Sequence, residues 1–189
     1  AGSRLATARF RDGELPEVAD VVRLASSLCA AGQETTARLI AAGMRILAED
    51  RALADALRAR PDGIPGFVEE CLRLEGPIKS TFRLALRDTE IAGVDVPAGS
   101  IVMGCVGAAN RDARVFDDPE RFDPKRRNVR RHIAFGHGEH FCPGASLARA
   151  EARISFERLL ARLDDLELPD PGALTYAETF IILGLTALP

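Results

Sequence analysis

Several features are missing from this chain of 189 residues, and each absence excludes a class of protein. No run of about 18 apolar residues occurs, so the sequence predicts no membrane-spanning helix. The first residues carry no apolar segment of the kind found in a signal peptide. Basic residues are not in excess, because the formal net charge is −3, and this argues against nucleic acid as a partner.

Paired cysteine motifs are missing as well, because none of the four cysteines belongs to a Cys-x-x-Cys pair. That spacing argues against a zinc site. Without a sign of secretion, disulfides are not expected, and reduced cysteines favour a cytoplasmic location. With 47% hydrophobic and 28% charged residues, we expect residues 1–189 to form a single globular unit.

The most informative stretch covers residues 135–150 and reads FGHGEHFCPGASLARA. Its single cysteine, Cys142, lies among Gly136, Gly138 and Gly144. Glycine permits positive φ angles and a close approach of the backbone. The apolar residues that follow predict a helix from Gly144 to about residue 162. Cys142 is therefore expected at a helix N-terminus, where free N–H groups and the helix dipole favour a thiolate.

Four functional interpretations of Cys142 compete: a disulfide, a zinc ligand, a catalytic nucleophile and an iron ligand of haem. The first two fail for the reasons given above. A nucleophile suits the dipole but does not need several glycines just upstream. A thiolate bound to haem iron needs both a surface on which a flat macrocycle can lie and N–H donors near the sulfur. A buried structural cysteine is the plain alternative.

This stretch resembles the haem-binding loop of the cytochrome P-450 family, whose pattern is Phe-x-x-Gly-x-(His or Arg)-x-Cys-x-Gly. The fixed positions are filled by Phe135, Gly138, His140, Cys142 and Gly144. The resemblance implies haem b as the cofactor, with Cys142 as the iron ligand and His140 as a propionate contact. It also implies that Phe135, Gly136 and Gly144 help to bind the cofactor.

A long helix is predicted from Pro16 to about Glu49, because apolar residues recur there at helical spacing without a proline. Its middle carries the sequence AAGQETT, in which a glycine weakens the helix and an acid precedes two hydroxyls. An exposed glutamate beside a tolerated glycine explains this equally well. The stretch resembles the distal helix of the same family, which implies that Ala31 lines the pocket and that Glu34 and Thr35 deliver protons during dioxygen activation.

Two shorter helices, over about 49–60 and 64–74, are followed by strands over about 78–86 and 101–106. Glu70 and Arg73 lie three residues apart and can pair on one helix face; a solvated surface pair is the plain alternative. The resemblance implies that they are buried and joined by Arg121 in a structural triad. It also assigns Arg83 to a haem propionate. Residues expected in the substrate pocket, besides Ala31, are Ile78, Lys79, Phe180 and Ile181.

A basic run precedes the cysteine loop and comprises Lys125, Arg126, Arg127, Arg130 and Arg131. Such a run is usually a solvated face, but beside a haem it can steer an acidic electron donor. The soluble character resembles family members that a ferredoxin reduces. His132, just after the run, is expected to be structural.

Together these features predict a mainly α fold with small β-sheets that resembles the C-terminal half of the cytochrome P-450 fold. That half comprises the distal helix, the Glu-x-x-Arg helix, the meander, the cysteine loop and the proximal helix; the N-terminal half is absent. The predicted function is insertion of one oxygen atom from dioxygen into a small organic substrate, with electrons from a ferredoxin-type donor. The main alternative is a truncated relative without catalysis, acting as a partner-binding or inactive haem-fold protein. A haem sensor or a peroxygenase is a third class. A missing N-terminal half or a second copy of the chain is a candidate further partner.

Overall fold

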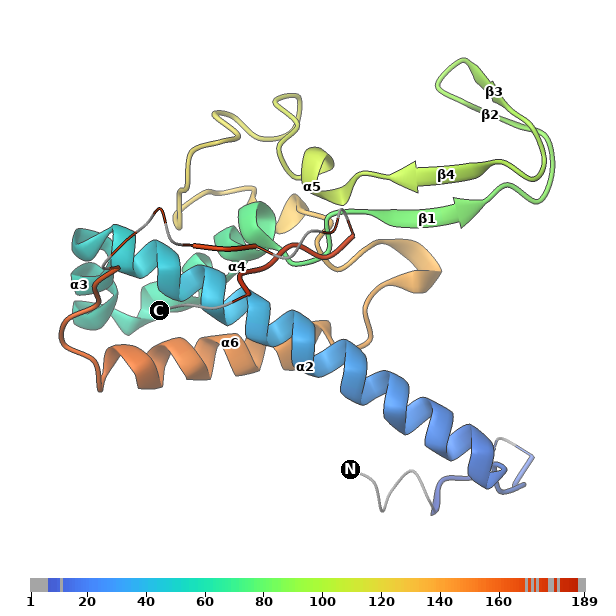
Figure 1. Cartoon of the computed structure of the whole chain (residues 1–189), viewed down its shortest axis with the longest axis horizontal. Coiled ribbons are helices and arrows are strands. Elements are labelled where there is room, and N and C mark those ends of the chain that lie inside the picture. Colours follow the sequence, from blue (N-terminus) through green and yellow to red (C-terminus); the bar gives the residue numbers. More distant parts are fainter. Residues whose placement is uncertain are drawn as a thin grey trace.

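The computed structural model describes residues 7–10, 12–168, 170, 172, 174–176, 179 and 181–186. Within them the chain is mainly helical with two small antiparallel sheets, which confirms the expected fold class (Figure 1). The helices are α2 (Val18–Glu49), α3 (Arg51–Ala59), α4 (Ile64–Glu75), α5 (Val106–Ala109) and α6 (Ala145–Leu160), with 3-10 turns η1 (Pro61–Gly63), η2 (Val129–Arg131) and η3 (Gly138–His140). The strands are β1 (Thr81–Leu84), β2 (Thr89–Ile91), β3 (Val94–Val96) and β4 (Ile101–Gly104). Among these helices none combines the length and the apolar character that crossing a membrane requires.

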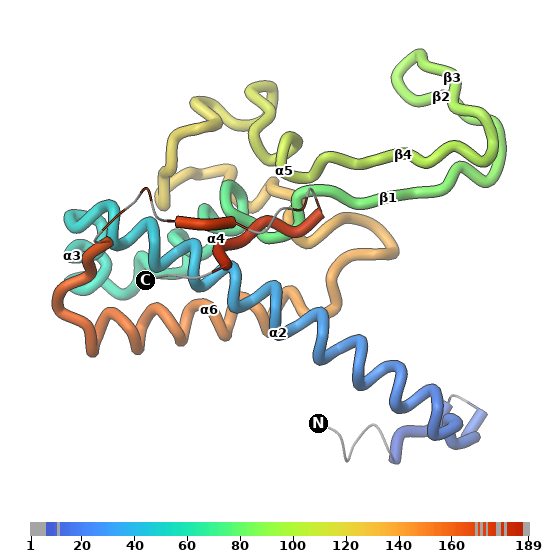
Figure 2. The backbone as a smooth tube through the Cα atoms, viewed as in Figure 1, coloured from blue at the N-terminus to red at the C-terminus, as the bar shows by residue number. Residues whose placement is uncertain are grey.

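The long helix predicted from Pro16 is present as α2, which has 32 residues. All of its buried residues lie in the second half and begin at Thr36: Thr36, Leu39, Ala42, Gly43 and Leu47. The first half extends beyond the other elements, as the backbone trace shows (Figure 2). Its apolar side chains Val18, Val22, Leu24 and Leu28 are exposed. Only the second half of α2 therefore contributes to the core.

The core lies where α2, α4 and α6 meet. Phe67 of α4 packs edge-on against Phe156 of α6, with ring centroids 5.0 Å apart. A Cβ atom at Gly43 of α2 would overlap the Phe156 ring, so glycine at this position lets the two helices approach closely. Asp50 ends α2, and its side chain accepts a hydrogen bond from Leu53 N–H and so caps α3.

The strands form a ribbon that projects from the helices and carries the β2–β3 hairpin at its far end (Figure 1). β1 pairs with β4, and Thr81 lies opposite Gly104. Both strands are shorter than the sequence predicts. Ile78 forms a bridge with Ile182 instead of joining β1, and Val106 already begins α5.

A buried ion cluster fixes α4 to the irregular segment that precedes the cysteine loop. Both oxygens of Glu70 accept hydrogen bonds from Arg73, at 2.8 and 2.7 Å, and neither side chain has any exposed surface. Arg73 also donates to the backbone carbonyls of Asn110, Pro119 and Arg121. A buried charge pair is tolerable only when its remaining donors and acceptors are satisfied, and this one meets that condition.

The expected third member of this cluster, the Arg121 side chain, is not part of it. Arg121 is exposed and contributes only its backbone carbonyl. The second guanidinium on Glu70 belongs to Arg126, whose Nε lies 3.2 Å from Oε1 and whose side chain is 7% exposed. Arg126 also donates to the Asp118 and Arg121 carbonyls. The bend of the chain at Asp123 directs Arg126 inward, because Asp123 N–H itself donates to Glu70.

This geometry predicts that Glu70 and Arg126 are structural and that Arg121 is dispensable. Glu70→Ala leaves two buried guanidinium groups without a counter-charge, so we expect a loss of roughly 3–5 kcal/mol in unfolding free energy. Arg126→Ala should also destabilise the protein. Arg121→Ala is the matched control and should change stability by less than about 0.5 kcal/mol. Denaturant unfolding measures all three; a Glu70→Ala protein with the parent midpoint and a selective loss of turnover would contradict the structural role.

Candidate functional site

The loop that carries Cys142 folds back on itself through backbone hydrogen bonds. Cys142 N–H donates to the Phe135 carbonyl at 2.9 Å, and Phe141 N–H donates to the Gly138 carbonyl at 3.0 Å. Gly136 and Gly138 have φ angles of 75° and 71°, a region that side chains other than glycine rarely occupy. The two glycines are therefore required by the path of the chain, as the sequence indicated.

Cys142 lies three residues before Ala145, the first residue of α6, and no side chain caps the first turn of that helix. The N–H groups of an uncapped first turn and the positive end of the helix dipole both favour an anionic sulfur. The Cys142 side chain is half-buried, and a Cβ at Gly144 would lie 3.8 Å from Sγ. The loop thus offers an accessible thiol flanked by positions without side chains, which fits a haem-thiolate site.

The other cysteines do not offer such a site. All four are free thiols. Burial raises the pKa of the Cys71 thiol well above its usual value, and the carboxylates of Glu75 and Glu70 add to this effect. Cys71 is therefore a neutral core group. Cys29 and Cys105 are exposed and lie on α2 and next to α5, away from the glycine-rich loop.

A second buried ion cluster fixes the cysteine loop itself. Glu69 of α4 accepts hydrogen bonds from Arg149 of α6 at 2.6 and 3.1 Å. Its Oε2 also lies 2.9 Å from Nε2 of His132. Ala134 N–H donates to Nδ1 of this ring, so the ring proton is carried by Nε2 and faces the carboxylate. The guanidinium of Arg149 also lies over the Phe135 ring, 4.6 Å from its centroid.

The charge of Glu69 is maintained by these partners. Burial alone would raise the pKa of this carboxyl, but the hydrogen bonds from His132 and Arg149 outweigh it and lower the pKa to about 2 from 4.5. Glu69 thus remains ionised although it is only 5% exposed. His132 is structural, as expected, but Glu69 and Arg149 are additions to the expected site.

The acid–alcohol pair lies on the exposed side of α2. Thr35 Oγ1 donates to the Ala31 carbonyl one turn earlier at 2.6 Å. Glu34 accepts two hydrogen bonds from Arg38, at 2.7 and 3.1 Å. In the described part of the chain neither Glu34 nor Thr35 hydrogen-bonds to the cysteine loop. Arg38, which the sequence analysis did not single out, is therefore the immediate partner of the acid.

The expected pocket residues come together only in part. Ile78 bridges Ile182, and Lys79 N–H donates to the Ile181 carbonyl at 2.8 Å, so the two segments lie side by side. Phe180 lies outside the described residues. The Lys79 ammonium donates to the Leu74 carbonyl near the end of α4, at 3.0 Å.

The expected propionate contacts, Arg83 and His140, are both exposed. Among the described residues Arg83 donates to the carbonyl of its neighbour Phe82, at 2.8 Å, and this bond uses one of the five N–H donors of its guanidinium. His140 ends the η3 turn, two residues before Cys142. Both positions are compatible with binding a carboxylate from the solvent side.

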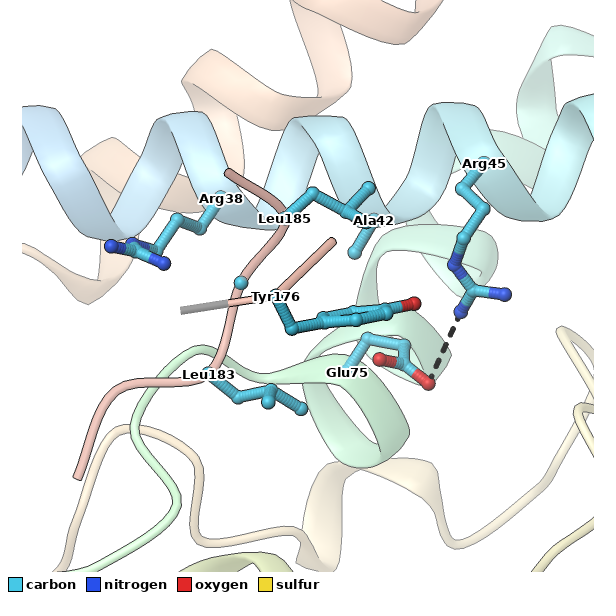
Figure 3. Close-up of a pocket in the computed structure, with 8 residues that line it drawn as sticks. Arg38, Ala42, Arg45, Glu75, Tyr176, Leu183 and Leu185 are labelled. Atoms are coloured by element: carbon cyan, nitrogen blue, oxygen red, sulfur yellow. Dashed lines mark ion pairs between the residues drawn. The ribbon is translucent and has the colours of Figure 1, made fainter. Parts of the chain in front are cut away.

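Two hollows differ in size and in what they can hold. A hollow of about 360 Å³ lies against the cysteine loop and is lined by Arg130, His132, Phe135, Phe141, Ser146 and Arg149. A cavity of about 10 Å³ lies between α2, α4 and the C-terminal segment, where Tyr176 sits beside the Arg45–Glu75 pair (Figure 3). The second cavity has room for a water molecule at most, so it is too small to bind a substrate. Around it, Tyr176, Leu183 and Leu185 of the C-terminal segment lie beside α2 and α4.

The local sequence carries no signal for the additional partners of Glu69 and Glu70. Residues 67–74 read FVEECLRL, with five apolar and three charged residues. At helical spacing Glu69, Glu70 and Arg73 share one face, which is the pattern of an amphipathic helix with a solvated side. The burial of that face depends on Arg126 and Arg149, which come from distant parts of the chain.

The family comparison agrees with this geometry. The Cytochrome P450 family model matches residues 64–182, which contain both ion clusters and the cysteine loop. The Cytochrome P450 monooxygenase PikC of Streptomyces venezuelae is 43% identical over 99% of this chain. The Erythromycin C-12 hydroxylase of Saccharopolyspora erythraea is 40% identical over 99%. The chain spans only 45% and 47% of these two proteins, about half their length.

Solved structures lead to the same family. The substrate-free Mycobacterium marinum cytochrome P450 CYP150A6 superimposes with a TM-score of 0.93 at 48% identity, over 97% of this chain and 47% of that one. The ligand-free cytochrome P450 TbtJ1 superimposes with a TM-score of 0.91 at 41% identity, over 97% and 48%. At these identities the likeness extends beyond the fold to the sequence.

The Glu69 cluster predicts a pH dependence of stability. Because the pKa of Glu69 is lower in the folded chain than its ordinary 4.5, its ionised form stabilises the fold above that value. The contribution is about 3 kcal/mol at neutral pH and should be lost as the pH falls from about 5 to 2. Glu69→Gln should flatten this part of the stability curve. The exposed Glu151→Gln changes the net charge equally and should not; equal acid sensitivity of parent and Glu69→Gln would contradict the assignment.

Proposed function

The chain belongs to the cytochrome P450 family, and from that membership we propose that it forms the haem-binding part of a haem-thiolate monooxygenase. The reaction inserts one atom of dioxygen into a small organic substrate and reduces the other to water, with two electrons and two protons consumed. The observation that carries the proposal is Cys142, an accessible thiol in a glycine-rich loop at the uncapped N-terminus of α6.

Haem b, when bound, supplies the dioxygen activation that amino acids do not. Cys142 Sγ would be the ligand for its iron, since the thiolate form of cysteine is the metal ligand. Phe135 holds the loop by accepting the Cys142 N–H. Arg83 and His140 are the proposed propionate contacts, because both present cationic or hydrogen-bonding groups to solvent.

Glu34 and Thr35 are the proposed proton carriers. Thr35 Oγ1 uses its proton on the Ala31 carbonyl and keeps its lone pairs free to accept a hydrogen bond. The Glu34 carboxylate is half-exposed and can exchange protons with water. Ala31, Ile78 and Ile181 are the proposed walls of the substrate pocket, together with Phe180.

A ferredoxin-type donor is the proposed source of electrons. The hollow against the cysteine loop is lined by Arg130 and Arg149, and Arg127 and Arg131 of the same basic run are exposed. Such a surface attracts an acidic partner. Free thiols at all four cysteines suit a reducing compartment, so we propose a cytoplasmic location.

Activity is proposed for the family fold as a whole, of which this chain spans about half the length in its relatives. Exposed apolar residues support the need for further covering structure, both on α2 and on the strand ribbon. On the ribbon they are Phe82, Leu84, Ile101 and Met103. Apolar surface on this scale marks an interface with another segment or another copy. If a chain of only these residues binds haem one-to-one and turns over substrate, the need for further covering structure is contradicted. The same result would exclude a truncated relative without catalysis.

The iron ligand is tested by the spectrum of the ferrous carbonyl complex. A thiolate ligand shifts the Soret band to the red, and Cys142→His should abolish that shift because imidazole is a weaker electron donor. Cys105→Ser, at an exposed thiol outside the loop, is the control and should keep the shift. Persistence of the red-shifted band in Cys142→His would exclude Cys142 as the ligand.

The proton carriers are tested by the coupling of reductant to product. Thr35→Ala removes the hydroxyl, so an active enzyme that contains this chain within the whole family fold should consume reductant while releasing peroxide in place of product. Proton-transfer groups typically contribute about 10²–10⁴-fold to rate. Thr35→Ser keeps the hydroxyl and should keep most of the coupling. Unchanged rate and coupling in Thr35→Ala and in Glu34→Gln would remove the pair from the mechanism.

A further inference from the structure

Arg149 connects a buried carboxylate to the aromatic ring of the cysteine loop. Its Nε and Nη2 donate to the two oxygens of Glu69 at 2.6 and 3.1 Å. The same guanidinium lies over the Phe135 ring, 4.6 Å from the centroid. We infer that Arg149 is a positioning residue for Cys142, acting by holding the Phe135 ring and with it the carbonyl that accepts the Cys142 N–H. This inference rests on the proposed role of Cys142 as the iron ligand.

The two-point contact is what gives Arg149 a fixed orientation. An arginine that binds both oxygens of a carboxylate has its guanidinium plane set by that pair. The Arg149 side chain is 33% exposed, but the Glu69 side chain is only 6% exposed, so the anchor is in the interior. His132 binds Oε2 from a third segment of the chain. The carboxylate therefore cannot turn to follow the arginine outward.

The Phe135 side chain packs against the hydrophobic core, and the Arg149 guanidinium lies over a face of its ring. The side chain is half-buried and borders the 360 Å³ hollow. Its aromatic neighbours are His132 and Phe141, with ring centroids 6.2 and 6.4 Å away. Arg149 is closer than either. Loss of the guanidinium would therefore release one face of the ring.

The Phe135 ring is linked to Cys142 through the backbone carbonyl of Phe135 itself. The Phe135 carbonyl accepts the Cys142 N–H at 2.9 Å, and the next residue is Gly136, at a φ angle of 75°. A displaced ring shifts that carbonyl, and glycine gives the loop freedom to follow it. Partners beyond the ligands fix ligand orientation, and their loss typically costs 10–100-fold in metal affinity or activity. Arg149 lies on α6, whose first residue is three positions after Cys142, so the restraint is anchored close to the cysteine along the chain.

The test compares Arg149→Ala with Arg153→Ala in the haem-loaded protein. Arg153 lies one turn further along α6 and pairs with Glu157 on the same helix, so it controls for loss of an α6 arginine. For Arg149→Ala we expect faster amide hydrogen exchange at Cys142, since its N–H loses a fixed acceptor. We also expect the haem affinity to fall by about 10-fold or more. The ferrous carbonyl complex should show a mixture of shifted and unshifted Soret bands. Arg153→Ala should match the parent in all three measurements.

Arg149→Lys separates positioning from charge. Lysine keeps a positive charge for Glu69 but lacks the planar fork, so exchange at the Cys142 amide should be intermediate between the parent and Arg149→Ala. Parent-like exchange, haem affinity and spectrum in both Arg149 variants would overturn the inference. Loss of fold in both variants would overturn it too, because it would assign Arg149 to stability alone.

Failure of the proposed function gives a different result. If the parent protein shows no red-shifted carbonyl band, Cys142 is not the iron ligand, and the proposed function fails whatever Arg149 does. If the parent shows the band and Arg149→Ala keeps it in full with unchanged amide exchange, the inference fails alone.

Discussion

The carboxylate of Glu70 has no exposed surface, and the fold around it depends on the positive groups that surround it. Arg73 binds both of its oxygens, and Arg126 approaches one of them from a segment more than fifty residues later in the chain. An unpaired charge at this position would lower the unfolding free energy by several kcal/mol. The pairing with Arg126 therefore restricts the path of the segment between Asn110 and Arg126. Glu69, the adjacent residue, repeats the arrangement with His132 and Arg149 and so attaches the next segment. Glu70 thus holds the chain before the cysteine loop, and its neighbour Glu69 holds the segments on either side of the loop.

Through the two clusters, α4 fixes the positions of the segments on either side of the cysteine loop. α6 begins three residues after Cys142 and packs on α2 and α4 in the core through Phe156. The cysteine is therefore held from three directions: by its hydrogen bond to Phe135, by the helix that follows it and by the ionic contacts of that helix with α4. A metal ligand needs such restraint, because misplacement of a ligand weakens the bond that it makes. The acid–alcohol pair on α2 is held less tightly, since Glu34 and Thr35 bond only within their own helix in the described residues.

Periodicity and local motifs in the sequence predict the helices well, because helix formation depends on spacing along one segment. They predict α2, α3, α4 and α6 within a few residues, together with the positive-φ glycines of the loop. They fail where partners come from distant segments. Arg126 reads as one of five basic residues on a solvated face, and only the fold turns it inward while Arg127 beside it stays exposed. Arg149 carries no local signal that separates it from Arg153 on the same helix.

The central proposal is that Cys142 binds the iron of a haem. A crystal structure of the haem-loaded protein, with anomalous data collected at the iron absorption edge, tests it without reference to activity. We expect a single iron peak within bonding distance of Cys142 Sγ. An iron peak beside a histidine or beside another cysteine would contradict it, as would a Cys142 side chain turned into the protein core.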